Sequence, residues 1–487
     1  MPSVIERILK GGSGFFAANL ITKGLGFLFI VIASRILGPA EFGVLALSIS
    51  VFGVARKLAT FGLPHTIQRF LSGEDGAENV RQIYGSILFL GVGVGLIASV
   101  ALYTLAPYLA GTLFEEPRLR VPLRILAPGT LAALGFALYR AVLQAQEQIG
   151  GIVRVDSARS AAKILLLVGL FTLWSQSAVD GILAVAGSFL IGALFAWWEV
   201  QKLDVSPDFS EMRSYLGKVV SYSGPLVVVG FSYFIAQQAD RLMLGWLSGA
   251  KEVGIYTATS TLAMIMSTLH ASLISIFMPI ASDAYRRGVA SELRKSYLFI
   301  SRWMGLINGM ALLVFAGGGM WLLTLFGTEY VSQTTYIVLV ILSTLYFIGT
   351  WVGPTGALLE MADGHRLELL NTVLFVSLNL VLNYILILRW GVIGATLATF
   401  ISGVARNLLQ LVEIQYHYGI NPVGRRNLVV LLLTIGGTTL LFFIPHGVAR
   451  TVITVPVVGV LATYAFWSAK REEREEVCGL LRQYTAA

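Results

Sequence analysis

Long apolar stretches separated by short polar links dominate this sequence of 487 residues and restrict its fold more than any other feature. A membrane-spanning helix needs about 20 mainly apolar residues, and about 14 such stretches can be marked. They fall at 13–34, 42–63, 83–107, 121–143, 158–175, 179–198, 217–247, 254–280, 297–325, 333–358, 367–388, 391–413, 427–444 and 449–468. Backbone polar groups cannot stay unpaired in lipid, so these stretches predict helices. We expect an all-α integral membrane protein of about 14 transmembrane helices.

The overall composition excludes an ordinary soluble domain. Hydrophobic residues make up 56% of the chain and charged residues 13%, against roughly 25% charged in soluble proteins. The single cysteine, Cys478, excludes an intrachain disulfide and a cysteine-ligated metal centre. The first apolar run is too long for a signal-peptide core, so we interpret it as an uncleaved first helix.

The distribution of Lys and Arg predicts the orientation. With the N-terminus on the cytoplasmic side, 21 basic residues fall in cytoplasmic segments and 8 on the opposite side. Arg159 and Lys163, at the start of the fifth stretch, are counted here among the cytoplasmic bases. The bias predicts a multi-pass protein of the cell (plasma or inner) membrane with both termini cytoplasmic. It also accounts for most of the net charge of +8 without nucleic acid.

A faint internal repeat divides the chain. Residues 37–43, after the first helix, and 248–254, after the seventh, share a Gly-x2-Glu-x-Gly pattern at an offset of 211 residues. Gly181 and Gly394 match at an offset of 213 residues. A repeat of six helices returns the chain to the same side of the membrane, so the two copies should be parallel, with substrate bound between them near the midplane.

This repeat predicts three parts. We expect an N-terminal six-helix bundle at 1–212, a C-terminal six-helix bundle at 213–420, and two further helices with a cytoplasmic tail at 421–487.

Basic residues inside the apolar stretches are the main site candidates, because such a residue facing lipid costs about 2.5–3.5 kcal/mol. Arg140 and Arg302, near cytoplasmic helix ends, are expected to reach the headgroups. Adjacent residues lie about 100° apart on a helix, so we expect only one of Arg56 and Lys57, preferably Arg56, to face a cavity. The substrate-binding candidates are Lys23, Arg56, Lys57, Gln237, Arg241, His270 and Arg406, of which His270 and Arg406 could instead be packing or snorkelling residues.

The seventh helix carries a polar stripe. Tyr233, Gln237 and Arg241 are spaced four residues apart and share one face. Asp240 beside them could pair with a nearby base, or could serve ion coupling or gating. It is the only acidic residue well inside an apolar stretch by this reading. A lumen with several bases and almost no acids favours an anionic substrate and disfavours a cationic drug.

Several chemistries are missing. The chain has no Gly-x4-Gly-Lys-Ser/Thr motif, so a built-in P-loop ATPase is not expected. The five histidines are scattered without metal-ligand spacing. A membrane-embedded glycosyltransferase or polymerase would need a catalytic carboxylate or histidine cluster, which the sequence does not offer. We therefore expect a transporter and no enzyme, with no cofactor; Na+ or H+ coupling, or the membrane potential, could supply the energy.

Three sequence segments are distinctive: SRILGPAEFG at 34–43, DRLMLG at 240–245 and GATLAT at 394–399. They resemble segments of the Wzx-like polysaccharide flippases of the multidrug/oligosaccharidyl-lipid/polysaccharide exporter superfamily. Residues 34–43 read SRILGPAEFG and are similar to the family's junction between helices 1 and 2. Residues 240–245 (DRLMLG) with 253–256 (VGIY) look like its helix 7–8 junction. The stretch 383–391 followed by 394–399 (GATLAT) is similar to its helix 11–12 region.

The resemblance implies two six-helix bundles forming a V, with two additional helices. It also implies translocation of a polyprenyl-pyrophosphate-linked oligosaccharide from the cytoplasmic to the outer leaflet by alternating access. A multidrug or small-metabolite cation antiporter of the same fold, or a flippase for a lipid-linked cell-wall precursor, are the alternatives. The expected partners are the lipid-linked glycan, membrane lipids and the glycosyltransferases and polymerase of the same pathway, with no nucleic acid; we expect a monomer.

Overall fold

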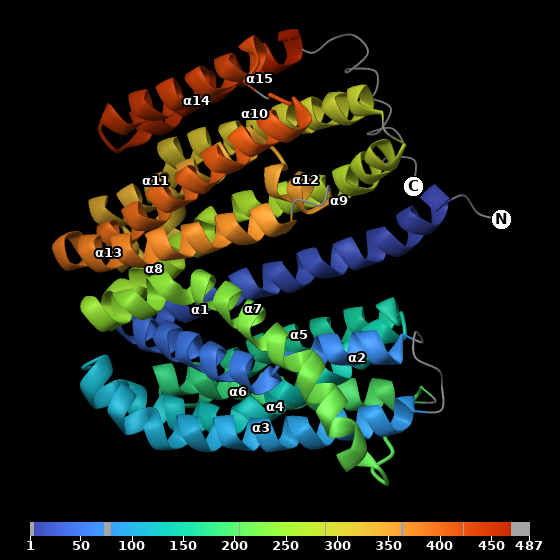
Figure 1. Ribbon diagram of the computed structural model, residues 1–487. Helices are drawn as coiled ribbons and strands as arrows, with labels where there is room; N and C mark the ends of the chain where they lie inside the picture. The colour runs from blue at the N-terminus through green and yellow to red at the C-terminus, as the bar shows by residue number, and fades with distance from the viewer. Residues whose placement is uncertain are drawn as a thin grey trace. The chain divides into compact units, whose positions relative to one another are not determined.

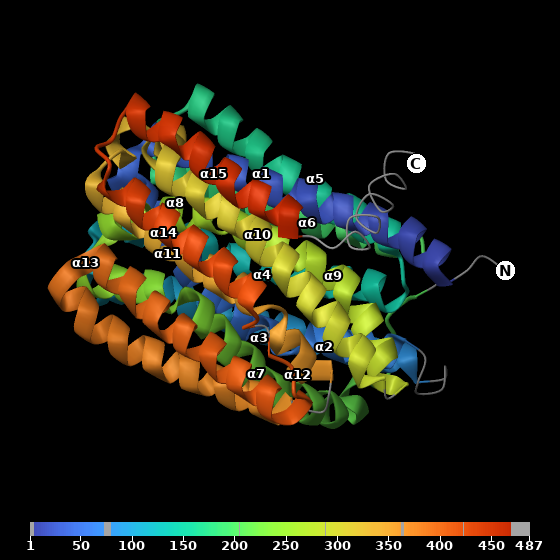
Figure 2. The same ribbon diagram turned by 90° about the horizontal axis from the view of Figure 1, so that it is seen from above.

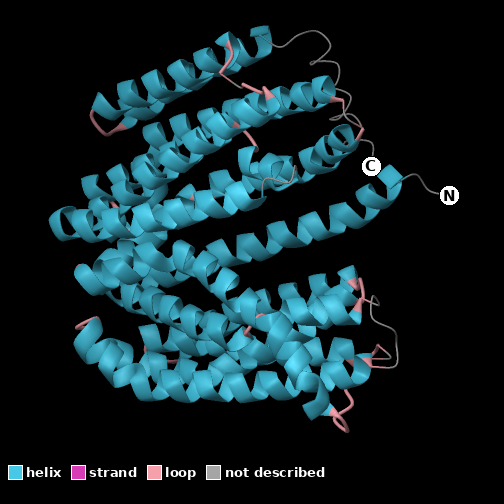
Figure 3. Cartoon of the chain, viewed as in Figure 1, coloured by secondary structure: helices cyan, strands magenta, loops and turns pink. Residues whose placement is uncertain are grey.

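The computed structural model describes residues 4–72, 79–203, 205–287, 289–361, 365–421 and 423–468. Across these residues the chain forms helices joined by short links, and none of them forms a strand (Figure 3). The predicted all-α membrane fold is confirmed. The chain divides into two units, each packed within itself. The first unit comprises Met1–Thr261, Leu325–Tyr330 and Asn383–Ala395; the second comprises Leu262–Thr324, Val331–Leu382 and Thr396–Ala487.

The first unit contains the blue to green helices of Figure 1. Its helices are α1 (Val4–Thr60), α2 (Leu63–Leu71), α3 (Val80–Tyr108), α4 (Arg120–Ala145), α5 (Ile149–Leu173), α6 (Ala178–Val200), α7 (Met212–Leu247) and α8 (Ala250–Ala263). Short turns η1 (Leu109–Leu113), η2 (Pro117–Leu119) and η4 (Thr328–Tyr330) complete it. Within this unit α6 packs against both α4 and α5, and α1 packs against α4 and α5 (Figures 1 and 2).

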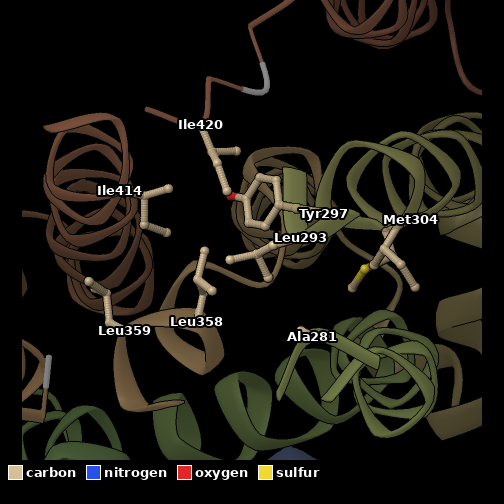
Figure 4. Packing of buried hydrophobic residues seen from close by; sticks show 9 residues of the cluster. Ala281, Leu293, Tyr297, Met304, Leu358, Leu359, Ile414 and Ile420 are labelled. Carbon is tan, nitrogen blue, oxygen red and sulfur yellow. The ribbon is translucent and has the colours of Figure 1, made fainter. Parts of the chain in front are cut away.

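The second unit holds most of the remaining helices. These are α9 (Ile265–Arg286), α10 (Ala290–Leu323), α11 (Gln333–Val352), α12 (Thr355–Met361), α14 (Arg425–Phe443) and α15 (Val448–Ser468). The turn η3 (Thr324–Phe326) and the long helix α13 (His365–Tyr418) each contribute to both units. One core of the second unit joins α9, α10, α12 and α13 around Tyr297 (Figure 4), whose hydroxyl donates to the carbonyl oxygen of Val352 at 2.8 Å.

Two glycines divide the longest helices. Gly38 in α1 has φ 68° and Gly391 in α13 has φ 51°, so each interrupts the helix with a left-handed residue. At Gly38 a Cβ would also lie 2.6 Å from Oε2 of Glu329. The apolar segments of these helices, 21–60 and 367–418, are 40 and 52 residues long, and about 20 residues suffice for one crossing. Each can therefore hold two successive spans.

The helices are long and apolar enough for a membrane protein with many spans. Nine segments of the described chain satisfy both requirements, counting each glycine-divided helix once. The expected total of about 14 therefore stays a prediction, as do the boundaries at 212 and 420.

A second break lies at the end of α1. Phe61 and Gly62 have φ values of 44° and 69°, and the chain then turns into α2, which buries Leu63, Ile67 and Phe70. A left-handed conformation is uncommon for a residue such as Phe61. The break ends α1 three residues after Lys57 and brings the N-terminus of α2 beside it.

The proposed repeat is reflected in a reciprocal contact inside the first unit. A Cβ at Gly43 would overlap the carbonyl oxygen of Ala250, and a Cβ at Gly254 would overlap the carbonyl oxygen of Pro39. Ala250 and Gly254 each follow Pro39 and Gly43 by 211 residues, so the same contact is made twice with the two copies exchanged. The symmetry supports the internal repeat and explains why both positions need glycine.

The acidic residue of each repeat copy also has a matching role. Glu41 Oε2 accepts a hydrogen bond from the backbone N–H of Ala178 at 3.4 Å, at the start of α6. Glu252 Oε2 accepts one from Val392 at 3.1 Å, directly after the break at Gly391. Carboxylates stabilise helix N-termini, where backbone N–H groups have no partner within the helix.

We predict that Gly43→Ala and Gly254→Ala each destabilise the protein by about 1–3 kcal/mol or more, because the added methyl group must displace backbone. Thermal unfolding of the detergent-purified protein measures the effect. Gly93→Ala is the matched control, since no atom lies within 4 Å of a Cβ at that helical position. Equal stability of all three variants would contradict the reciprocal contact.

Candidate functional site

A cavity of about 280 Å³ lies wholly within the first unit. We call it the basic cavity. It is lined from α1, α2, α4 and α7 by Arg56, Lys57, Thr60, Gly62, Pro64, His65, Gln68, Ala133, Phe136, Ala137, Arg140, Ala141, Gln144, Leu226 and Val227. Three of the lining side chains carry a positive charge and none carries a negative charge.

Both adjacent bases of α1 line the basic cavity. Arg56 extends toward α6, where its guanidinium carbon lies 5.4 Å from the ring centroid of Phe189. Lys57 extends toward α7 and lies against Gly230, where a Cβ would be 2.9 Å from Nζ. The expectation that only one of the two faces a cavity is therefore wrong. The cavity lies beside the turn between α1 and α2, close to the end of α1 at Thr60. Both long side chains can therefore reach it, although they leave the helix in different directions.

Arg140 of α4 also lines the basic cavity. Its Nε donates to Oδ1 of Asp156 on α5 at 2.9 Å. Headgroup contact was expected for this residue from its position near the helix end. The ion pair with Asp156 instead holds it at the cavity wall. Nearby, Gln68 Nε2 donates to Oε1 of Gln144 at 3.1 Å and joins α2 to α4.

Two further bases lie next to the basic cavity, on α5. The Arg159 guanidinium carbon is 5.1 Å from the ring centroid of Phe136 and 4.9 Å from that of Phe189. One turn further along, Lys163 Nζ lies 4.5 Å from the ring centroid of Phe29 on α1. Aromatic faces attract cations in this way.

Sequence reasoning counted Arg159 and Lys163 with the cytoplasmic bases, because the apolar stretch that contains them was taken to begin only at residue 158. The helix begins at Ile149. Arg159 is thus ten residues into α5, about 15 Å along its axis. The spacing of four between the two bases, which puts them on one helix face, was the signal that could have identified them.

The positive charge of this region is largely uncompensated. The region holds five bases, and one carboxylate is close to two of them: Asp156 is ion-paired with Arg140 and attracts Arg159. The other three bases are Arg56, Lys57 and Lys163. The described residues offer no carboxylate ion-paired with Arg56, Lys57, Arg159 or Lys163. The N-terminus of α2 adds partial positive charge at the cavity wall. Such a region is suited to bind an anionic group and repels cations.

Asp240 and Arg241 belong to a separate polar cluster between α7 and its neighbours. Tyr256 of α8 donates its hydroxyl to Asp240 Oδ2 at 2.5 Å, and Asn383 Nδ2 donates to Oδ1 at 2.8 Å. Arg241 Nε donates to Thr257 Oγ1 at 3.2 Å. The acidic residue thus receives hydrogen bonds from neutral side chains of α8 and α13.

The remaining predicted site residues are not brought into the basic cavity. Lys23 on α1 and Gln237 on α7 have exposed side chains. The side chains of Tyr233 and His270 lie outside the described residues. Arg302 was expected at the headgroups but is only 6% exposed on α10, so that expectation is wrong.

Arg406 lies in the second unit and has an acidic partner. It donates to Glu368 within α13, and its guanidinium carbon lies 5.7 Å from the ring centroid of Phe375. Glu368 also accepts from Gln410 Nε2 at 2.7 Å. An ion pair of this kind can stabilise the two arms of α13 against each other. Among the residues that can be described, no group of three or more His, Cys, Asp or Glu could hold a metal ion.

Comparison with known proteins gives consistent results. The profile of the family described as polysaccharide biosynthesis protein matches residues 8–284. A probable low-salt glycan biosynthesis flippase, Agl15 of Haloferax volcanii, is 26% identical over 417 residues, covering 83% of this chain and 84% of the relative.

Two solved structures show the same fold. The lipid II flippase MurJ in an inward closed conformation matches with a TM-score of 0.75 and 15% identity, covering 93% of this chain and 97% of that one. An inward-facing multidrug transporter of the MATE family matches with a TM-score of 0.64 and 16% identity, covering 82% of this chain and 94% of that one.

We predict that Asp240→Ala lowers the free energy of unfolding by about 1–3 kcal/mol, because Tyr256 and Asn383 lose their acceptor. Thermal unfolding in detergent measures this loss. Gln237→Ala, three residues earlier on α7 and exposed, should leave the unfolding temperature unchanged. If both variants unfold at the wild-type temperature, the hydrogen bonds to Asp240 do not stabilise this unit.

Proposed function

The chain belongs to the polysaccharide biosynthesis protein family, and on that premise we propose that it is a flippase for lipid-linked oligosaccharide. It moves a polyprenyl-pyrophosphate-linked glycan from the cytoplasmic to the outer leaflet of the cell membrane. The basic cavity is the observation that supports this most directly. Its bases lie within a bundle of apolar helices, where an uncompensated charge is costly. An anionic headgroup would offset that cost while bound.

The proposed transport proceeds by alternating access between the bundles 1–212 and 213–420, with 421–487 as an appendix and both termini cytoplasmic. Lys23, Gln237, Arg241, His270 and Arg406 remain our proposed additional contacts for the glycan or its phosphates. Asp240 is the proposed coupling or gating residue, with Na+, H+ or the membrane potential as energy source. Glycosyltransferases and a polymerase would supply and consume the substrate, and the protein acts as a monomer without being an enzyme.

A multidrug or small-metabolite cation antiporter has the same fold, as the likeness to the MATE transporter illustrates. The electrostatics of the basic cavity favour the flippase, because positive side chains repel an organic cation. A flippase for a lipid-linked cell-wall precursor would bind the same kind of phosphate head. The glycan attached to the lipid therefore distinguishes these two, and the cavity does not.

We predict that removal of the protein causes a lipid-linked oligosaccharide to accumulate on the cytoplasmic face of the membrane. Spheroplasts or inverted vesicles treated with a glycan-modifying enzyme report which leaflet holds the glycan. Re-expression of the wild-type chain should restore the normal distribution. An unchanged distribution of every such lipid would contradict the flippase proposal. Altered efflux of organic cations would support the alternative that the protein is a cation antiporter.

We predict that Arg56→Ala lowers transport of the lipid-linked glycan about 10- to 100-fold at subsaturating substrate, because a hydrogen bond to a charged group contributes about 1.5–3 kcal/mol. Lys23→Ala tests in the same way whether that exposed base contacts substrate. Transport is measured in proteoliposomes after confirming equal insertion. Arg213→Ala, exposed near the start of α7, is the control and should transport normally. Normal transport by Arg56→Ala would remove the basic cavity from the mechanism.

A further inference from the structure

We propose that Arg159 and Lys163 form an inner anion site behind the basic cavity, and that this inner site makes the protein select a headgroup with two phosphates over one with a single phosphate. The inference rests on the proposed function and names two residues as determinants of its specificity. The basic cavity would contact one phosphate through Arg56 and Lys57. The inner site would contact the other.

The two sites meet at shared aromatic rings. Phe136 lines the basic cavity and also carries the Arg159 guanidinium 5.1 Å from its ring centroid. Phe189 lies within 5.4 Å of the Arg56 guanidinium carbon and within 4.9 Å of that of Arg159. The two guanidinium groups therefore approach one ring from different helices. A diphosphate could place one phosphate group at each guanidinium and accept hydrogen bonds from both at the same time.

The packing around Arg159 leaves one of its buried hydrogen-bond donors unpaired. Its Nε is buried and has no hydrogen-bond partner among the described residues. Gly192 of α6 makes room for it, since a Cβ there would lie 2.9 Å from Arg159 Cγ and 3.0 Å from Phe136 Cδ2. The side chain is thus held in place between α4 and α6 before any ligand binds, which limits the entropy lost on binding.

Charge balance favours the diphosphate. Asp156 is ion-paired with Arg140 and also attracts Arg159, so one carboxylate serves two of the five bases. Arg56, Lys57 and Lys163 have no ion-paired carboxylate among the described residues. A diphosphate linked at both ends carries one negative charge on the oxygens of each phosphate group, whereas a monophosphate linked at both ends carries a single charge. In a site of low dielectric constant the basic side chains repel one another strongly. Each negative charge that the ligand brings offsets this repulsion.

The test measures binding to the full-length protein in nanodiscs of zwitterionic lipid. The probes are one monosaccharide linked through a diphosphate and the same monosaccharide linked through a monophosphate, both on the same polyprenyl chain. The wild type should bind the diphosphate probe more tightly. The preference is expressed as the dissociation constant of the monophosphate probe divided by that of the diphosphate probe. In Arg159→Gln this ratio should fall about tenfold, with the affinity for the monophosphate probe nearly unchanged.

Arg154→Gln is the matched control. Arg154 lies five residues earlier on α5, is exposed and is ion-paired with Glu199 at 2.8 Å, so its loss should leave the ratio unchanged. Lys163→Gln should lower the ratio while leaving the stacking of Arg159 intact, which keeps the test informative if Arg159→Gln fails to fold. Arg159→Lys, which retains the charge, should keep most of the preference.

An unchanged ratio in Arg159→Gln or, if that variant does not fold, in Lys163→Gln would overturn the inner site. So would an equal loss of affinity for both probes, which indicates a merely structural role. Neither result affects the outcome of the removal experiment, which tests the flippase function separately. If removal leaves the glycan distribution unchanged while the binding ratio still depends on Arg159, the transport proposal fails and the inner site stands.

Discussion

The cost of placing positive charge among apolar helices is the constraint on which the proposed site depends. Lipid and packed aliphatic side chains solvate a guanidinium poorly, so such a group needs a counter-ion, an aromatic face or access to water. In the second unit Arg406 meets this need with Glu368. In the first unit Arg140 meets it with Asp156. Both are compensated within the protein itself.

Arg56, Arg159 and Lys163 meet the same need differently. Arg56 lies against the ring of Phe189, and Arg159 lies against the rings of Phe136 and Phe189. Lys163 lies against the ring of Phe29. Cation–π contacts offset part of the cost and leave the net charge in place. The region is therefore prepared for an external anion, whereas the ion-paired arginines are not. This contrast within one chain supports a ligand-binding role more strongly than the number of basic residues does.

The polar residues of α7 show why the position of a charged residue inside an apolar stretch is an incomplete guide to its function. Asp240 stood out as an acidic residue inside an apolar stretch. Its hydrogen bonds from Tyr256 and Asn383 connect three helices, so it stabilises the first unit whatever else it does. Arg241 is held by Thr257 in the same manner. A polar group inside a helix bundle needs hydrogen-bonding partners whether it stabilises the fold or takes part in transport. Its position in the sequence does not distinguish these two roles.

The sequence by itself determined the all-α membrane fold and the repeat, because apolar length and recurring glycines act locally. It also singled out Arg56 as a candidate, because its position inside an apolar stretch can be read from the chain, and the structure places this residue at the wall of a cavity. Only the tertiary structure decided that Lys57 shares its cavity, since the sequence marks the end of this stretch at residue 63 but does not show which elements pack around it. Likewise, the position of Arg159 and Lys163 next to the basic cavity depends on where α5 begins and on aromatic rings contributed by α1, α4 and α6. Such contacts join residues distant in sequence, and no local pattern encodes them.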